Sequence, residues 1–407
     1  MIRSITRRRA AAGLLLTAIV GLGAAGGLYR FFPSETADFL RDQLGYDTVF
    51  QLEEAVFSLQ DGFNQARYSL LGNRAEASDT VPEDIQPVVN SADRALAAAP
   101  PPPDLTHGVA AAQPPAKPAP MLLPDIQPLG VPLREGEGGW RIDDLPRTSA
   151  DEMLMAKASV RPDRSRPYSV VQALLFDQRR INLHIVGGTK HPGGDRGVVG
   201  PGVIPEADLP NLLAAWNGGF QGIHGLNSQY GADARGNLRF YRPLVDGFAS
   251  VAVYQDGSIK LGEWGRDLSF SEDLVAVRQN NILLVDNCEV NPRTKEGNRT
   301  WGYVKAGDTA TFITWRSAIG VTANGDFIVA AGNDLSADTL ARSLWALGAC
   351  YAMQLDINRP YVLTTLYYDQ PDGSLVTKKP MDQMPTDIGR FTSRRPQERD
   401  FMYLTVR

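Results

Sequence analysis

Alternating apolar and polar positions recur over the second half of the chain and predict many short strands. Such segments, most of them bounded by glycine, proline or acidic turn residues, lie at 153–160, 169–176, 181–186, 248–254, 258–261, 281–286, 361–368, 375–377 and 402–406. Residues 205–215 are instead expected to form a short helix. Since strands outnumber helices and follow one another in mixed order, we expect an α+β fold. Mixed or antiparallel β-sheets with flanking helices would then occupy residues 136–407.

One run inside this domain combines all of these elements. Residues 315–332 predict two strands joined by a hairpin turn, and leucines at 340, 344 and 347 recur at helical spacing. Ser336 is a suitable N-cap and Gly348 a suitable helix stop. A last strand then delivers Asp356 at its C-terminal end.

Three ordered motifs in this region resemble those of the phosphodiester glycosidase family, which includes the mannose-6-phosphate uncovering enzyme. Residues 215–220 read AWNGGF, residues 316–320 read RSAIG, and Leu355 and Asp356 open a motif whose family form is LDGGGSS. The resemblance covers roughly the last 260 residues. The third motif departs from the family pattern, because residues 357–360 read INRP where GGGS is expected.

The resemblance implies a hydrolase of glycosidic phosphodiesters and a set of site residues. Arg316 would hold phosphate oxygens and Asp356 would act as general base or nucleophile. Residues beside the motifs complete the candidate site: His224 as proton donor, and Trp216, Asn217, Gly218, Gly219, Asn287 and Asn358 as substrate-binding residues. If Arg316 and Asp356 only pair with each other, they hold strands together instead.

The first 30 residues predict a membrane anchor or a signal segment. Arg3 and the arginines at 7–9 precede an uncharged run over 10–29, about the length of a membrane-spanning helix. Positive charge before this run predicts an N-terminus in the cytoplasm, with a single pass and the C-terminal domain outside, periplasmic or extracellular. A twin-arginine or secretory leader is the alternative. Both interpretations export the rest of the chain.

Residues 34–72 predict a helix with an apolar stripe. Its apolar residues alternate spacings of three and four, at positions 49, 52, 56, 59, 63, 66 and 70. This spacing is typical of a coiled coil, so the chain can self-associate through residues 49–70. An amphipathic helix packed on its own domain or on the membrane fits equally.

Residues 79–135 predict an extended, disordered linker. The stretch includes AAAPPPPDL and AAQPPAKPAP, a composition that cannot bury enough apolar surface to offset its ordering entropy. In an exported protein it would hold the next domain away from the membrane.

Composition narrows the choice of partners. The net charge of -5 argues against nucleic-acid binding, which needs a concentrated basic surface.

The two cysteines, Cys288 and Cys350, exclude a disulfide framework and leave two possibilities, a single pair or two buried thiols. The glycine-rich residues 187–202 fit either a phosphate-binding loop or a mobile surface loop, and match no known phosphate fingerprint.

No cofactor is required by the sequence, although a divalent metal can serve a phosphodiester site through Asp286, Asp356 and Asn358. We expect a phosphosugar or an envelope glycopolymer as substrate. One alternative is a non-catalytic envelope protein that binds a glycan through Trp216, Tyr230 and Trp301. Another is a structural factor that acts through the heptad segment.

Overall fold

The computed structural model of the chain describes residues 40, 43–71, 121–147, 153–221, 227–302, 311–370, 374–381, 383–385, 387 and 389–407. The chain divides into two compact units, Met1–Leu71 and Gly72–Arg407. The anchor predicted over residues 1–30 lies outside the described residues. Among the described residues, no helix is both long and apolar enough to cross a membrane.

In the first unit, α3 extends over Tyr46–Leu71. It confirms the predicted helix from Tyr46 onward. Much of the predicted apolar stripe is exposed to solvent, at Leu52, Leu59, Phe63 and Leu70. Self-association through residues 49–70 stays a prediction.

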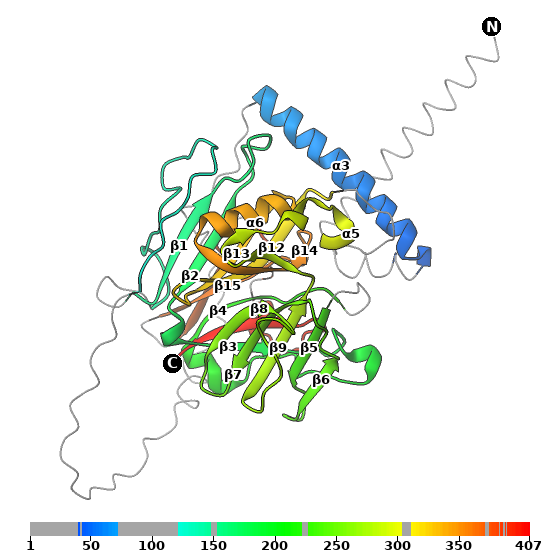
Figure 1. Ribbon diagram of the computed structural model, residues 1–407, viewed down its shortest axis with the longest axis vertical. Helices are drawn as coiled ribbons and strands as arrows, with labels where there is room; N and C mark the ends of the chain where they lie inside the picture. Colours follow the sequence, from blue (N-terminus) through cyan, green and yellow to red (C-terminus); the bar gives the residue numbers. More distant parts are fainter. Residues whose placement is uncertain are drawn as a thin grey trace, which may run out of the picture. The chain divides into compact units, whose positions relative to one another are not determined.

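The second unit is built on a seven-stranded sheet (Figure 1), with strand order β1-β2-β13-β12-β14-β10-β11. Its strands are β1 (Met155–Val160), β2 (Val171–Phe176), β10 (Leu283–Asp286), β11 (Glu289–Val290), β12 (Thr314–Thr322), β13 (Phe327–Leu335) and β14 (Ala349–Ile357). All of these neighbours pair antiparallel.

Two five-stranded antiparallel sheets complete the unit. The second sheet has the order β16-β15-β4-β17-β3 and the third has the order β6-β5-β9-β7-β8. The second contains β3 (Ile181–Val186), β4 (Leu212–Asn217), β15 (Thr364–Asp369), β16 (Leu375–Lys378) and β17 (Phe401–Val406). The third contains β5 (Asn227–Ala232), β6 (Leu238–Arg242), β7 (Ala249–Tyr254), β8 (Ile259–Glu263) and β9 (Leu274–Asn280).

Helices are few among the described residues of this unit. There, the α-helices are α5 (Asn298–Trp301) and α6 (Ala337–Ala346), and the 3-10 helices are η1 (Gln178–Arg180), η2 (Gly194–Arg196), η3 (Glu206–Asn211), η5 (Pro292–Lys295) and η6 (Arg390–Thr392). Helix α6 covers one face of the seven-stranded sheet (Figure 1) and buries Leu340, Leu344 and Leu347 there, as predicted. Ser336 caps it in a capping box with Thr339. The α+β expectation is confirmed.

The main apolar core lies on the other face of the seven-stranded sheet. Side chains of that sheet, such as Ile319 and Leu355, pack with Trp216 of the second sheet and Val251 of the third. The core therefore joins three sheets, and it ends where the strands carry polar residues. That polar end is the candidate site described below.

The short helix predicted over 205–215 is wrong in its second half. Its first part is the 3-10 helix η3, and β4 begins at Leu212. All six residues of β4 are buried, and the strand pairs with β15 and β17. Burial between two partner strands outweighs the helix propensity of its leucines and alanines.

The predicted C-terminal boundary of the linker, residue 135, is wrong. Its residues 121–135 lie among the described residues and pack on the domain: Met121 is buried beside α6, and Gln127 N donates to Ala346 O (2.8 Å). Trp140 Nε1 also donates to Pro124 O (2.9 Å). The apolar residues between the prolines have a surface to bury, and proline loses little backbone entropy when it is fixed. The remainder, 79–120, lies outside the described residues.

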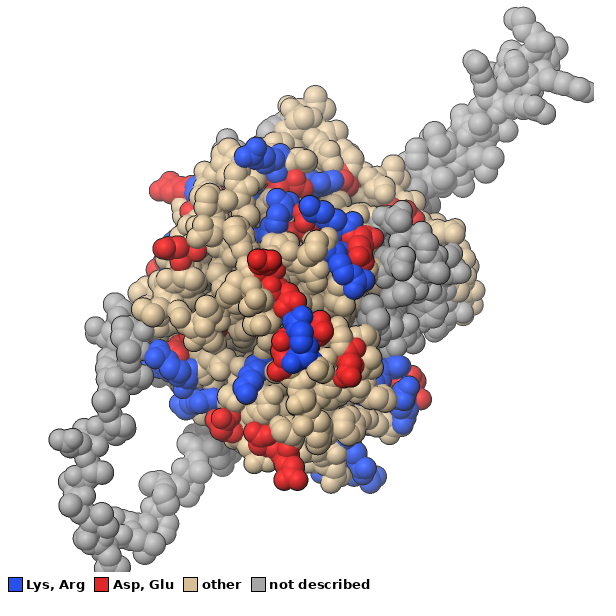
Figure 2. Space-filling model, in the orientation of Figure 1, with Lys and Arg blue, Asp and Glu red and all other residues tan. Residues whose placement is uncertain are grey.

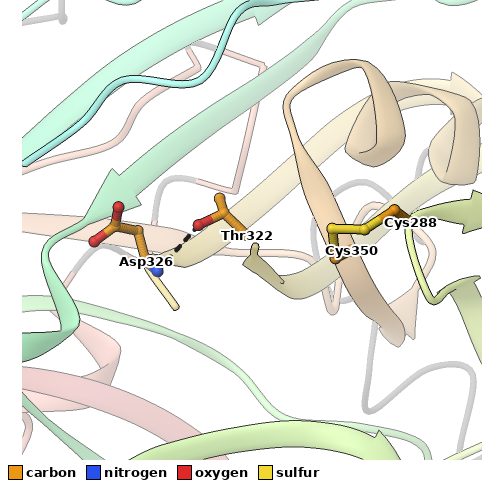
Figure 3. Close-up of a disulfide and its surroundings, with 4 residues drawn as sticks. All are labelled: Cys288, Thr322, Asp326 and Cys350. Carbon is orange, nitrogen blue, oxygen red and sulfur yellow. Dashed lines mark hydrogen bonds between the residues drawn. A yellow bond between two sulfur atoms is a disulfide. The ribbon is translucent and has the colours of Figure 1, made fainter. Parts of the chain in front are cut away.

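The cysteine pair left open by the sequence forms a disulfide (Figure 3), which joins Cys288 to Cys350 at the start of β14. Asn287 and Cys288 both have positive φ, as the tight turn between β10 and β11 requires. Cys288 occupies a position where glycine is usual, because the sulfur is needed for the bond. Closing a loop of 62 residues is worth about 4 kcal/mol in the chain-entropy account.

The glycine-rich residues 187–202 pack at both ends against the segment that leads into β17. Thr189 N donates to Gln397 O, Lys190 N to Glu398 O, and Gln397 N to Gly202 O. A Cβ on Gly188 would overlap the backbone of residues 398–399. The glycines therefore allow two backbones to touch, and they hold the segment that carries Arg399 and Asp400.

Candidate functional site

Asp356 lies at the end of β14 as predicted, with 7% of its surface exposed. Its carboxylate accepts hydrogen bonds from Ile357 N (2.9 Å) at Oδ1 and from Arg399 Nη1 (3.0 Å) at Oδ2. Burial raises the pKa of this carboxyl to about 6, although the Arg399 charge acts to lower it. A carboxyl with such a pKa can both release and accept a proton near neutral pH.

Arg399, which the sequence did not single out, is the cation of this site. Its guanidinium lies 3.8 Å above the centre of the Tyr361 ring. The Gln221 amide oxygen accepts from Arg399 Nη2 (2.6 Å) and Nε (3.2 Å) when the amide is oriented to match donors with acceptors. The Arg399 side chain is 23% exposed, so a ligand in solvent can reach it while stacking and hydrogen bonds fix its plane.

Arg316 does not belong to this group. It is 1% exposed, and its guanidinium donates to Leu335 O, Trp301 O, Phe312 O and Gln354 Oε1 at 2.7–3.0 Å. Among the described residues it makes no ion pair and no hydrogen bond with Asp356. Burial lowers its pKa to about 9, so the cation persists at pH 7.

A register shift between β12 and β14 explains this separation. Arg316 lies opposite Ile357, whereas Ala318 lies opposite Gln354, so one extra residue of β14 intervenes. Such a bulge turns the next side chain to the other face of the sheet. Arg316 consequently contacts residues on the α6 side, while Asp356 contacts Gly218 and Arg399, which flank strands of the second sheet. Neither the proposed joint phosphate site nor the proposed structural ion pair of these two residues is present.

Asn217 binds the backbone around the site, and both its amide nitrogen and its amide oxygen form hydrogen bonds within the protein. Its Nδ2 donates to Ser317 Oγ (2.9 Å) and Gly218 O (3.0 Å), and its Oδ1 accepts from Leu363 N (3.1 Å). Ser317 Oγ donates onward to Asp356 O (2.8 Å). Asn217 is therefore brought next to Asp356, as expected, but as an anchor of strand ends.

Several other predicted site residues have structural roles instead. Trp216 is 1% exposed and packs in the apolar core, so it cannot contact a substrate in this structure. Trp301, expected to bind a glycan, is equally buried. Asn358 has positive φ, and its Oδ1 accepts from Thr314 Oγ1 (3.0 Å). It lies near Asp356 but shapes the turn after β14.

Asn287 is not brought to the site. Its neighbour Cys288 is bonded to Cys350, and Asp356 lies six positions further along the extended strand, about 20 Å away. Asp286 lies at that same distant end and pairs with Arg266. The metal ligands proposed with it are therefore not assembled, and the described residues contain no cluster of three or more His, Cys, Asp or Glu arranged for a metal ion. His224 lies outside the described residues.

A second buried acid provides a useful contrast. Asp326 lies in the turn between β12 and β13, where its backbone amide donates to Thr322 Oγ1 (3.1 Å; Figure 3). Burial and the nearby Asp177 charge raise its pKa to about 6. The pKa of Asp326 is therefore similar to that of Asp356, but the two residues have different interaction partners.

The residues missed by sequence reasoning come from two segments. Arg278 interrupts the apolar run LVAVRQN of β9, and Arg399 and Asp400 directly precede the apolar strand β17. Charged residues inside or beside buried strands are uncommon unless paired. That signal was available, but it does not tell which acid meets which arginine.

Comparisons with known proteins give limited matches. No protein-family model and no curated protein matches the chain. Among solved structures, the zebrafish N-acetylglucosamine-1-phosphodiester alpha-N-acetylglucosaminidase catalytic domain, auto-inhibited by its pro-peptide, is 16% identical. The alignment covers 65% of this chain and 86% of that one with a TM-score of 0.40. A hypothetical protein from Synechocystis is 13% identical over 62% of each chain, with a TM-score of 0.33.

Proposed function

We propose that this chain is a hydrolase of glycosidic phosphodiester linkages in envelope glycopolymers or glycosyl phosphates. The observation that carries the chemistry is the contact of a buried carboxyl, Asp356, with a reachable arginine, Arg399. The substrate class rests on the motif resemblance at residues 215–220, 316–320 and 355–356.

In this proposal Arg399 takes the role first expected of Arg316. A phosphate diester bound to Arg399 would place its negative charge against the guanidinium that now faces Asp356 Oδ2. Because the Arg399 charge lowers the pKa of Asp356, neutralising that charge raises the pKa further. Substrate binding would thus favour the protonated carboxyl, which can donate its proton to the leaving oxygen.

We also propose that the protein is exported and tethered by its first 30 residues, with the second unit outside the cytoplasm. The Cys288–Cys350 disulfide supports export, because such bonds persist mainly in oxidising compartments. Basic and acidic side chains are interspersed on the face in Figure 2, in keeping with a substrate other than nucleic acid.

The test is release of sugar by the full-length protein from a panel of UDP-sugars and glycosyl phosphodiesters. Asp356→Asn is expected to lower turnover by about 10²–10⁴-fold, the usual share of general acid–base catalysis. Asp326→Asn is the matched control, since it removes a buried acid of similar pKa near the far end of β12. No release by the wild type from any phosphodiester would reject the proposal.

A non-catalytic glycan binder is the second candidate, favoured by one observation. Phe240 of β6 and Phe270, which lies between β8 and β9, are about half exposed and pack with Tyr230, with ring centres 4.8–5.8 Å apart. Exposed rings of this kind can stack on sugars. Retention on immobilised glycans that is lost in Phe240→Ala, together with absent turnover, would favour this candidate.

A further inference from the structure

Beside Asp356 lies a second, fully buried pair, Arg278 and Asp400. Arg278 Nε donates to Asp400 Oδ2 (2.8 Å) and Nη2 donates to Oδ1 (3.2 Å), with side-chain exposures of 0% and 2%. The pair also binds the turn after β4. Gly218 N donates to Asp400 O, Gly219 N to Asp400 Oδ2, and Arg278 Nη2 to Phe220 O (2.8 Å).

This pair explains the two glycines of the NGGF motif. A Cβ on Gly218 would overlap the Asp400 carboxylate, and a Cβ on Gly219 would lie about 3 Å from the Arg278 guanidinium and from Asn280 Oδ1. Neither glycine has positive φ. Their small size is therefore needed to admit the buried pair, rather than to let a ligand approach the backbone.

The same turn is bonded directly to the strand that carries the candidate catalytic acid. Asp356 N donates to Gly218 O (3.0 Å). Asn280 accepts from Phe220 N (3.0 Å) and donates to Gln354 O (2.8 Å), so it makes a second link from the turn to β14. Asp400 is also the chain neighbour of Arg399. Both members of the Asp356–Arg399 contact are thus attached to one buried ion pair.

Stability alone gives a weak reason for such a pair. Removing two charges from water costs about as much as their attraction returns, and well-packed apolar residues often serve folding equally well. A buried ion pair does, however, fix the geometry of everything bonded to it, because any displacement leaves charges unpaired.

We propose that Arg278 and Asp400 are positioning residues, which hold the turn at residues 217–220 and Arg399 in register with Asp356. Their role as positioning residues rests on the proposed function of Asp356. The predicted changes in the titration of Asp356 can be measured without a substrate.

The experiment follows the titration of Asp356 in full-length protein with ¹³C-labelled aspartate carboxyl groups, its resonance assigned by its loss in Asp356→Asn. Asp400 raises the pKa of Asp356 through its charge, and Arg278 lowers it. Asp400→Asn is therefore expected to shift the titration down, and Arg278→Gln to shift it up. Both variants should also lose turnover on the phosphodiester that the wild type cleaves.

Glu137→Gln is the matched control. Glu137 pairs with Arg161 at 2.7 Å, with side-chain exposures of 2% and 1%, and its carboxylate also accepts from Arg134 N. It should lose stability as the Asp400 variant does and leave the Asp356 titration unchanged. Arg278→Gln is the deciding variant, because water entry alone would shift the titration down and not up.

Two results would overturn the inference. Unchanged titration in both site variants would show that the pair does not act on Asp356. A downward shift in both would show that the substitutions merely admit water, since hydration lowers the pKa of a buried carboxyl whichever charge is removed. An absence of turnover in the wild type would reject the proposed function and leave the titration result standing.

Discussion

Arg316 and Asp356 were both predicted as site residues, and their strands are neighbours, but their surroundings differ. Arg316 is enclosed on the α6 face by four oxygen acceptors of the protein itself. Asp356 lies on the other face, beside an arginine that is partly exposed. A charged side chain whose hydrogen-bond partners are all buried protein groups stabilises the fold. A charged side chain whose partner is also accessible to solvent can take part in a reaction with a bound ligand.

The largest effect expected from this comparison is on folding. Arg316→Met should lower the free energy of unfolding by roughly 4 kcal/mol or more, because four buried acceptors lose their donor at about 1–3 kcal/mol each. Urea unfolding measures this loss. Arg342→Met on α6 is the control, since the Arg342 side chain is 39% exposed and pairs with Asp338 one turn away. A stable Arg316→Met protein without activity would reverse our assignment of the two residues.

A somewhat smaller effect concerns pH. The pKa of Asp356 is raised on folding, so its contribution to stability is fully present below its unfolded value near 4 and is lost as pH rises through about 6. A displacement of about two units corresponds to roughly 3 kcal/mol.

Urea midpoints measured from pH 4 to 7 should therefore fall less steeply in Asp356→Asn than in the wild type. Asp326 titrates in the same window, so Asp326→Asn should flatten the curve as well, without loss of turnover. Equal slopes in the wild type and Asp356→Asn would mean that this carboxyl keeps its ordinary pKa.

The smallest effect separates the two arginines by function. Arg399→Gln should weaken turnover or binding of inorganic phosphate by about 10- to 100-fold, the worth of one or two charge-assisted hydrogen bonds. Arg394→Gln, five residues earlier and largely exposed, is the control. Isothermal calorimetry with phosphate gives the affinity without a substrate. Equal affinities in both variants would remove Arg399 from the site.

Local patterns were sufficient for most strands and for α6. The alternation at 181–186 matches β3 residue for residue, and Ser336 and Gly348 bound α6 as expected. Failures occurred where tertiary contacts outweigh local preference. Leu212–Asn217 becomes a strand because two partners bury it, and residues 121–135 pack because α6 lies beside them.

The site was predicted in part. Asp356 and Asn217 do come together, through Ser317. Arg316 was misplaced because a one-residue bulge reverses the face on which a side chain emerges, and motif spacing along the chain carries no record of it.

The sequence by itself determined the α+β class and the strand that ends in Asp356. These follow from hydrophobic periodicity, which acts over a few positions. Only the tertiary structure decided that Arg399 rather than Arg316 faces Asp356, that Asp400 requires the glycines, and that Cys288 meets Cys350. Each of these contacts joins segments far apart in the chain. The sequence shows where the charged residues and thiols are, but only the folded structure determines which partner each of them contacts.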